Sequence, residues 1–337
     1  MKIQRTIDLQ QFNSFGVPAI ATFFAAVENQ TDLEVALRFA ETENLPVQVL
    51  GGGSNTLFVH DFPGLLLHVA NKGVDWRDRS EGGATSIRIA AGENWHELVG
   101  SCLQKGLYGL ENLALIPGTA GAAPIQNIGA YGVELADFFL DATVYDRETG
   151  KWRVMDKQDC KFAYRDSLFK GDGFGRYIIF DLRLKLDTQW VPNLSYQGLE
   201  EALASSKPTP EEVFETVCQI RRSKLPDPRE IGNAGSFFKN PIISIERFKA
   251  LEKQLPGLPN YALEQEGLTK IPAAWLLEEL GWKGRTRGAA AVYNKHALVI
   301  INSGDANGED ILLLAQEMSS SVLEAYGIAL EPEVRIL

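Results

Sequence analysis

The sequence is poor in histidine, cysteine and methionine, and it lacks an excess of positive charge. Its 337 residues include 4 histidines, 3 cysteines and 3 methionines, and the net charge is −11. This charge argues against a nucleic-acid partner, because such binding depends on Lys and Arg side chains that neutralise phosphates. A small anionic ligand remains possible, since a local basic pocket can exist inside an acidic protein.

The few metal-binding and thiol residues are also widely scattered. The cysteines are Cys102, Cys160 and Cys218, and no two form a CxxC pair. This spacing argues against a disulfide framework or a zinc finger and is typical of a reducing cytosol. The histidines are His60, His68, His96 and His296. None belongs to an HExxH motif, which argues against a zinc enzyme.

No apolar run approaches the ~18 residues that a membrane span needs. The first ten residues, MKIQRTIDLQ, lack the apolar stretch of a secretory signal peptide. We therefore expect a cytoplasmic protein without a membrane partner. The chain is long for one compact domain, so we expect two or three hydrophobic cores.

Short strands, glycine-rich turns and helices alternate along the sequence. LPVQVLGGGSN (45–55) passes from a strand into three glycines, and a predicted strand at 87–91 leads through Gly92 into a helix. The sequence TDLE (31–34) predicts a capping box at the start of another helix. A last helix is predicted over 309–326, ending at Gly327. This alternation favours an α+β or α/β fold.

Two glycine-rich segments are candidates for binding a phosphate group. GGGSN (51–55) follows a strand, and LIPGTAGAAPIQNIGAYG (115–132) shows no periodicity. Glycine allows a backbone to approach a pyrophosphate and to offer N–H donors to it. GGGSN does not match GxGxxG, a Walker A loop is absent, and a tight turn would explain the three glycines equally well. Two such segments nevertheless suit a long dinucleotide such as FAD.

Each charged residue that is a candidate for the functional site could also have a purely structural role. Arg221, Arg222 and Lys224 lie at a predicted helix C-terminus, where they could complement the helix dipole or clamp a diphosphate. Arg165 in YRDSLFK could form a structural ion pair with Asp166 or another acid. Glu333 in EPEV could be a solvated residue of an edge strand.

Ser236 lies in GNAGSFFKNP (232–241), between a glycine and two phenylalanines. This context is not the GxSxG of a hydrolase nucleophile, and no histidine is nearby in sequence to activate the hydroxyl. Ser236 is therefore a poor candidate for a nucleophile. It could donate a proton if the acceptor is a strong base.

Seven ordered segments resemble the UDP-N-acetylenolpyruvoylglucosamine reductase (MurB) family over essentially the whole chain. They are VLGGGSN, ENLALIPGTAGAAPIQNIGAYGVEL, FAYRDSLFK, RRSKLPDP, GNAGSFFKNP, IPAAWLLEELGWKG and LEPEVR. The form of the family with a tyrosine in an extra loop is the most similar, since NLSYQGL supplies Tyr196.

The resemblance implies an α+β protein with two domains. Residues 1–190 would form a two-lobed FAD-binding domain of the vanillyl-alcohol-oxidase (PCMH) type, with lobes at about 1–70 and 71–190. Residues 207–337 would form a smaller α+β substrate domain whose last strand carries Glu333. The implied reaction is reduction of FAD by NADPH and of UDP-N-acetylglucosamine enolpyruvate by the flavin, which gives UDP-N-acetylmuramate for peptidoglycan synthesis.

The resemblance also assigns roles to residues within the matched motifs. The implied catalytic residues are Arg165, Ser236 and Glu333. The implied FAD-binding residues are Gly51, Gly52, Gly53, Ser54, Asn55, Pro117, Gly118, Thr119, Gly121, Ala122, Gln126, Asn127, Ile128 and Gly129. The implied substrate-binding residues are Tyr131, Tyr196, Arg221, Lys224 and Asn240. No metal ligand is implied.

Several further expectations follow. Neither glycine segment contains His or Cys, the usual residues of a covalent flavin link, so we predict noncovalent FAD. The absence of a Rossmann fingerprint leaves the choice between NADPH and NADH open. We expect a monomer acting on a UDP-sugar. The alternatives are another oxidoreductase on the same fold, such as a sugar-acid oxidase, and a noncatalytic flavin or sugar-nucleotide sensor.

Overall fold

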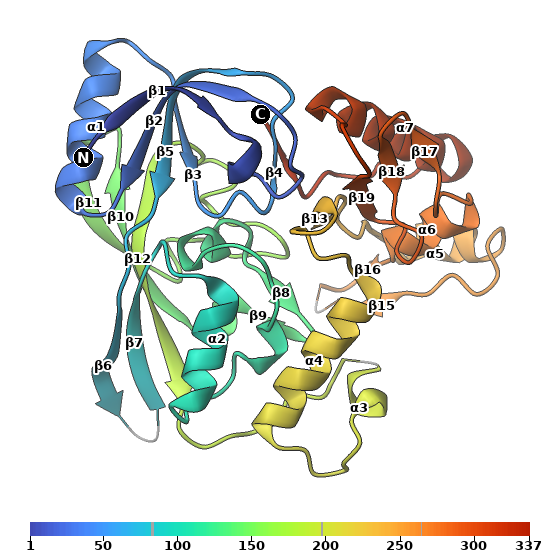
Figure 1. Cartoon of the computed structure of the whole chain (residues 1–337). Helices are drawn as coiled ribbons and strands as arrows, with labels where there is room; N and C mark the ends of the chain where they lie inside the picture. Colours follow the sequence, from blue (N-terminus) through green and yellow to red (C-terminus); the bar gives the residue numbers. More distant parts are fainter. Residues whose placement is uncertain (82–83, 197, 264) are drawn as a thin grey trace. The chain divides into compact units, whose positions relative to one another are not determined.

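The computed structural model describes residues 1–81, 84–196, 198–263 and 265–337. The chain divides into two compact units that interleave in sequence (Figure 1). The first consists of Met1–Ile7, Ala21–Gly53 and Phe62–Ser223, and the second of Asp8–Ile20, Ser54–Asp61 and Lys224–Leu337. A single boundary between 190 and 207 does not describe this interleaving. The assignment of 1–190 to FAD and 207–337 to substrate stays a prediction.

The first unit contains a four-stranded sheet covered by a helix. The strands lie in the order β1 (Ile3–Asp8), β2 (Ile20–Val27), β5 (Phe62–Val69) and β3 (Val47–Leu50). β5 pairs in parallel with both β2 and β3. Helix α1 (Gln30–Thr42) packs its buried side chains against Leu65 and Leu67 of β5. Parallel strands need such a cover because both of their faces are apolar.

The start of α1 differs from the predicted capping box at 31–34. The N-cap is Asn29, whose side chain accepts a hydrogen bond from the Asp32 N–H at 2.9 Å. The Asp32 carboxylate in turn accepts from the Glu28 N–H at 3.3 Å and from the Asn29 side chain at 2.9 Å. The prediction was wrong because Asn is as good a cap as Thr, and the earlier residue holds the position.

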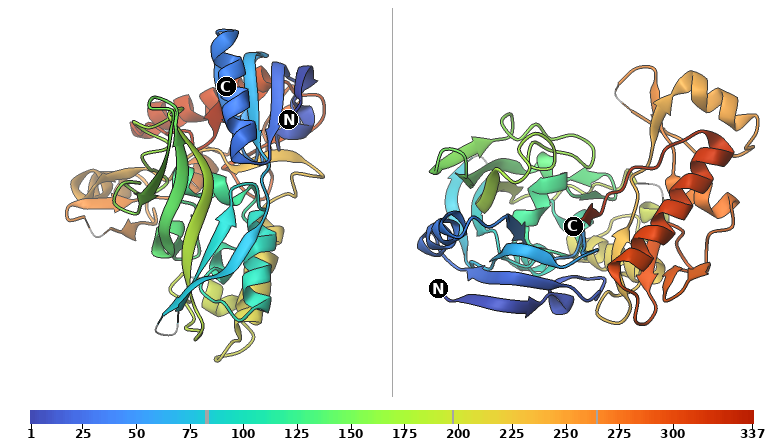
Figure 2. Two further views of the ribbon diagram at one scale, coloured as in Figure 1. Left: turned by 90° about the vertical axis from the view of Figure 1, so that its left-hand side faces the viewer. Right: turned by 90° about the horizontal axis from the view of Figure 1, so that it is seen from above.

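A second, antiparallel sheet forms the rest of the first unit. Its order is β11 (Lys151–Asp156), β10 (Phe139–Asp146), β12 (Tyr177–Asp187), β7 (Ala84–Ala90) and β6 (Val74–Glu81). Helices α2 (Trp95–Gln104) and α4 (Pro210–Lys224) share one hydrophobic cluster with it (Figures 1 and 2). The short helix α3 (Leu199–Ala202) precedes α4. The thiols of Cys102, Cys160 and Cys218 are free and buried.

Between α2 and β10 the chain forms short turns around a small hairpin. The 3-10 turns are η2 (Glu111–Leu113), η3 (Ala120–Gln126) and η4 (Leu135–Asp137). The hairpin consists of β8 (Gly129–Ala130) and β9 (Val133–Glu134). The segment without periodicity therefore forms neither a long helix nor a long strand.

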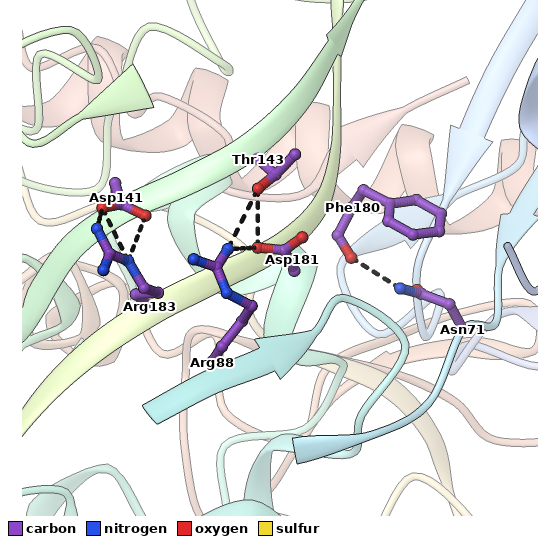
Figure 3. Close-up of polar contacts among 7 residues, drawn as sticks. All are labelled: Asn71, Arg88, Asp141, Thr143, Phe180, Asp181 and Arg183. Carbon is purple, nitrogen blue, oxygen red and sulfur yellow. Dashed lines mark hydrogen bonds and ion pairs between the residues drawn. The ribbon is translucent and has the colours of Figure 1, made fainter. Parts of the chain in front are cut away.

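Ion pairs join neighbouring strands of the five-stranded sheet (Figure 3). Arg88 on β7 contacts Asp181 on β12 at 2.7 Å, and the hydroxyl of Thr143 on β10 donates to the same carboxylate at 2.9 Å. Arg183 on β12 pairs with the buried Asp141 on β10. These pairs satisfy charges that the sheet would otherwise bury alone.

The second unit combines two small sheets with three helices. One sheet has the order β13 (Gly232–Ser236), β19 (Val299–Asn302), β18 (Ala290–Val292) and β17 (Thr286–Arg287). The other has the order β14 (Ile242–Ser244), β16 (Leu268–Lys270) and β15 (Tyr261–Ala262). The helices are α5 (Ile245–Glu252), α6 (Ala273–Glu279) and α7 (Gly308–Tyr326). The turn η1 (Gln10–Phe12) and the parallel pair β4 (Thr56–Leu57) and β20 (Arg335–Ile336) complete the unit.

Helix α7, the long red helix in Figure 2, ends where the sequence predicts. Gly327 follows it with φ 63°, a left-handed conformation that glycine adopts without strain. A capping box of Asn307 and Asp310 closes its other end. Within the described part of the chain, no helix is both long enough and apolar enough to cross a membrane.

The carboxylate of Asp146 should make stability depend on pH. Its hydrogen bonds with Arg176, at 2.8 and 2.9 Å, lower the pKa of this buried group to about 2 from 3.8. The pair therefore stabilises the fold above pH 3.8, and this contribution is lost as pH falls toward about 2. Asp146→Asn should lower the free energy of unfolding at neutral pH, measured with urea. The difference in this free energy between the variant and wild type should shrink below pH 3.8. A difference that stays constant with pH would contradict the prediction. Asp172→Asn, at an exposed residue, is the control.

Candidate active site

The two glycine-rich segments of the first unit lie against each other. A Cβ atom on Gly51 would lie 2.7 Å from the Oγ1 of Thr119, and one on Gly52 would lie 3.1 Å from the Cα of Gly118. A Cβ on Gly121 would lie 2.4 Å from that of Ala91. A side chain at Gly51 would displace that of Thr119, and one at Gly52 or Gly121 would crowd backbone atoms. Among the residues predicted to bind FAD, Gly51 and Gly52 are thus brought next to Gly118 and Thr119.

This region has features that fit FAD. The Oγ1 of Thr119 is buried and has no hydrogen-bond partner within the protein, so a ligand oxygen or N–H group could complete its bonding. The glycines leave backbone accessible to a pyrophosphate. Gly53, with φ 63°, ends the part of GGGSN that lies in the first unit, and Ser54 and Asn55 belong to the second.

The start of helix α2 holds the second glycine segment through the backbone. The Trp95 N–H donates to the Gly118 carbonyl at 3.1 Å, and the Ala120 N–H donates to the Glu93 carbonyl at 2.8 Å. The Gly121 N–H donates to the Ala91 carbonyl at 2.8 Å. An irregular buried segment must pair its polar groups in this way.

Residues 126–129 connect η3 to the hairpin. Asn127 has φ 44°, and its side chain donates to Glu134 at 2.7 Å and to the Ala163 carbonyl at 3.2 Å. The same side chain accepts from the Ala136 N–H at 2.9 Å. The nitrogen and the oxygen of this side-chain amide both bind protein groups. Asn127 would therefore contact a cofactor through its backbone.

Arg165 lies at the base of the hairpin. Its guanidinium donates to the Gly129 carbonyl at 2.5 Å, and it lies over the ring of Tyr164. The residue itself has φ 53°, a conformation that costs an ordinary residue about 1–2 kcal/mol. Such strain often occurs at functional sites, where surrounding contacts maintain it.

Tyr131 and Arg221 form a second cationic position in the first unit. Arg221 on α4 lies near the Tyr131 side chain: burial raises the pKa of that phenol, and the charge of Arg221 opposes the rise. Burial also lowers the pKa of Arg221, and the nearby Arg165 adds to this effect. The Nε of Arg221 is buried without a hydrogen-bond partner in the protein. Two guanidinium groups this close favour an anionic ligand.

The loop carrying Tyr196 is attached to the hairpin. The rings of Tyr131 and Tyr196 meet edge-on with centroids 5.1 Å apart. Buried Asn112 donates to the Tyr131 carbonyl at 2.8 Å and to the Asn193 carbonyl at 2.9 Å. Tyr196 remains 42% exposed, so one side of it is available to a ligand.

Ser236 and Glu333 lie on neighbouring segments of the second unit. The Glu333 N–H donates to the carbonyl of Phe237, the residue after Ser236, at 2.8 Å. The side chain of Asn55 donates to the Glu333 carbonyl at 3.0 Å. Gly235, with φ 71°, precedes Ser236 and lies where the register of β13 against β19 shifts, between Asn233 and Ser236. Residues far apart in sequence thus meet at one position.

The predicted substrate residues Asn240 and Lys224 also belong to the second unit. The Oδ1 of Asn240 accepts from the Ala273 N–H at 3.0 Å and so caps helix α6. Lys224 lies near His296, whose Nδ1 accepts from the Leu298 N–H at 3.2 Å. Burial lowers the pKa of His296, and Lys224 adds to this effect.

Two histidines lie near the predicted site although no role was predicted for them. His96 contacts the glycine-rich segment, and His296 lies near a predicted substrate residue. Both occur alone in sequence, so no motif could have identified them. In the described ranges, no group of three His, Cys, Asp or Glu side chains is arranged to hold a metal ion.

Comparison with known proteins agrees with these features. Residues 21–156 match the family described as FAD binding domain, and residues 227–337 match the family described as UDP-N-acetylenolpyruvoylglucosamine reductase, C-terminal domain. The reductase of that name from Burkholderia multivorans is 45% identical over 332 residues, which covers 96% of this chain and 94% of that protein. The one from Pseudomonas syringae pv. tomato is 43% identical and covers 99% of this chain and 98% of its own.

Solved structures show the same architecture. The UDP-N-acetylenolpyruvylglucosamine reductase (MurB) of Thermus caldophilus has a TM-score of 0.68 at 25% identity, covering 100% of this chain and 99% of its own. The 6-hydroxy-D-nicotine oxidase of Arthrobacter nicotinovorans has a TM-score of 0.55 at 14% identity, covering 97% and 86%, and shows a shared fold alone.

The fold and the glycine segments define an FAD-binding flavoprotein. The predicted α+β fold is confirmed, with an FAD-binding domain matched at residues 21–156 and a reductase C-terminal domain matched at residues 227–337. Within that class, the chain belongs to the UDP-N-acetylenolpyruvoylglucosamine reductase family. The predicted roles of individual residues stay predictions.

The contact of Gly51 with Thr119 should control cofactor binding. In Gly51→Ala the added methyl group would displace the Thr119 side chain, which is 2.7 Å from the Cβ position. Overpacking of about 1–3 kcal/mol should weaken FAD binding by about fivefold to 150-fold, measured by quenching of flavin fluorescence. Gly304→Ala, where the Cβ meets nothing within 4 Å, is the control. Equal FAD affinity in both variants and wild type would contradict the prediction.

Proposed function

We propose that this protein is an NADPH-dependent flavoprotein reductase of peptidoglycan precursor synthesis. It reduces UDP-N-acetylglucosamine enolpyruvate to UDP-N-acetylmuramate. The observation that carries the proposal is the family match over nearly the whole chain, at 45% identity. We further propose that it acts as a monomer in the cytoplasm, and its net charge of −11 supports the lack of a nucleic-acid partner.

The two glycine segments would hold the FAD. Bound FAD would supply the two-electron chemistry that links NADPH to the enolpyruvyl double bond. Gly51, Gly52 and Gly118 would admit the pyrophosphate, and the unsatisfied hydroxyl of Thr119 would gain a partner. Neither segment contains His or Cys, so we propose that the FAD is held without a covalent bond.

Arg165 is proposed to stabilise negative charge on the substrate. Reduction at the outer carbon of the enolpyruvyl group places charge on the neighbouring carbon, next to the carboxylate. A cation about 4 Å away, at an effective dielectric constant near 20, would stabilise this negative charge by on the order of 4 kcal/mol. A guanidinium suits this role because it stays charged and its fork matches a carboxylate. The bond from Arg165 to Gly129 supports a fixed position for it.

Ser236 is proposed to complete the reaction by donating a proton to the neighbouring carbon, which carries the negative charge after the outer carbon is reduced. A carbanion or enolate is basic enough to take a proton from a neutral hydroxyl, so no histidine is needed. Glu333 is proposed to form a hydrogen bond with the substrate carboxylate, or to protonate it, as negative charge develops there. The bond between the backbones of Glu333 and Phe237 supports a joint role for the glutamate and the serine.

Five residues are proposed to bind the UDP-sugar. They are Tyr131, Tyr196, Arg221, Lys224 and Asn240. The buried Nε of Arg221, which has no protein partner, supports a role in holding an anion. The exposed side of Tyr196 supports a role as a lid that places an aromatic ring over the substrate.

The proposal is tested with purified protein. Its visible spectrum should show a flavin, and the flavin should be released by acid precipitation. NADPH absorbance should fall in proportion to added UDP-N-acetylglucosamine enolpyruvate, and NADH should be compared in parallel. A yellow protein that ignores this substrate would indicate another flavin oxidoreductase. A protein that binds FAD and the substrate without consuming NADPH would indicate a sensor.

Replacement of Ser236 should separate the two halves of the reaction. In Ser236→Ala, NADPH should still bleach the flavin at close to the wild-type rate, because the serine is not needed for that step. Turnover of the enolpyruvyl substrate should fall by about 10²–10⁴-fold, the usual contribution of a general acid. Stopped-flow absorbance measures both rates. Wild-type turnover in this variant would rule out the donor role.

Replacement of Tyr196 should affect substrate binding. Tyr196→Ala should raise the KM for the enolpyruvyl substrate about threefold to tenfold, which corresponds to the loss of one aromatic contact. Tyr196→Phe keeps the ring and should resemble wild type. Steady-state kinetics at saturating NADPH provide the values. An unchanged KM in the alanine variant would show that Tyr196 is an ordinary loop residue.

A further inference from the structure

The first residues of helix α2 hold the cofactor segment through side chains as well as backbone. The indole N–H of Trp95 donates to the Leu113 carbonyl at 3.0 Å. The next residue, His96, accepts a hydrogen bond at its Nδ1 from the Leu115 N–H at 3.1 Å. Leu115 lies two residues before Pro117, where the proposed FAD-binding residues of this segment begin.

The Leu115 backbone needs this support. Its φ is 58°, in the left-handed region, which costs an ordinary residue about 1–2 kcal/mol. Such a conformation persists only when surrounding contacts maintain it. The imidazole of His96 supplies an acceptor for the N–H of this strained residue, at the entrance to the cofactor segment.

The orientation and tautomer of His96 are well defined. Its ring stacks on Phe214 of helix α4, with centroids 5.4 Å apart and an interplanar angle of 8°. Since Nδ1 accepts a hydrogen bond, the proton of the neutral imidazole must lie on Nε2. Protonation of Nδ1 would place two N–H groups against each other and abolish the bond.

We propose that His96 is a positioning residue for FAD: its neutral imidazole holds the segment that begins at Leu115, and its protonation releases that segment and weakens FAD binding. The inference rests on the proposed role of residues 117–119 in FAD binding. It adds a pH dependence of FAD binding that no sequence motif indicates.

The surroundings of His96 keep the imidazole neutral near pH 7. Burial is the main cause that lowers the pKa of His96 below its usual 6.5. Arg222 and Arg221 on α4 lower it further, whereas Glu97 on α2 and Glu215 on α4 oppose the change. FAD binding should therefore be constant above pH 6.5 and should weaken as pH falls below this value.

Two substitutions separate the hydrogen bond from the packing of the ring. His96→Asn places an amide oxygen close to the position of Nδ1, and this acceptor does not titrate. His96→Phe keeps an aromatic ring against Phe214 but has no acceptor. His60→Asn, at an exposed histidine, is the matched control.

The experiment titrates the flavin-free protein with FAD and follows flavin fluorescence between pH 8.0 and 5.0. For wild type and His60→Asn, the Kd should rise about fivefold to tenfold across the acidic range, the effect of one lost hydrogen bond. His96→Asn should bind within about twofold of wild type at pH 8.0 and show no acidic rise. His96→Phe should bind about fivefold to tenfold more weakly at every pH.

The outcomes are distinct. An acidic rise that persists in His96→Asn, or a wild-type Kd that is independent of pH, would overturn the inference. Lack of FAD binding by wild type at pH 8.0 would instead contradict the proposed function. Nitrogen NMR of the His96 ring gives a second readout that does not need a variant: the proton should lie on Nε2 at pH 8.0. A proton on Nδ1 at that pH would also overturn the inference.

Discussion

In the first unit, two glycine-rich backbone segments approach each other closely. A Cβ atom on Gly51 would displace the Thr119 side chain, and one on Gly52 would lie 3.1 Å from the Cα of Gly118. The buried segment that makes these contacts has few regular hydrogen bonds of its own, so neighbouring residues must satisfy its polar groups. The turn after strand β7 and the start of helix α2 provide the partners for these groups. The rest of the unit can be understood as the support for this arrangement.

That support combines rigid and strained parts. The five-stranded sheet carries paired charges on adjacent strands, and helices α2 and α4 pack on it through one apolar cluster. On this base, Leu115, Asn127, Tyr131 and Arg165 all adopt positive φ. Their concentration around one segment and one hairpin is typical of a functional site, where the fold maintains conformations that a free chain would avoid.

The second unit contributes chemistry of a different kind. Its proposed catalytic residues, Ser236 and Glu333, come from β13 and from the segment before β20, which a backbone hydrogen bond joins. Neither needs an activating histidine for the roles proposed here. In the proposed reaction, Arg165 would offset the charge that reduction creates, and Ser236 would neutralise that charge by donating a proton.

Much of this protein was predictable from sequence. The glycine segments, the order of the family motifs and the end of α7 at Gly327 are local properties, determined by which residues tolerate a conformation. The capping box at 31–34 was wrong, because several polar residues near a helix start can each act as the cap. The tertiary structure alone decided that Thr119 lies against Gly51, that Glu333 joins Phe237, and that His96 supports Leu115. These contacts join distant parts of the chain, and no local periodicity specifies which backbone groups meet when a core is packed.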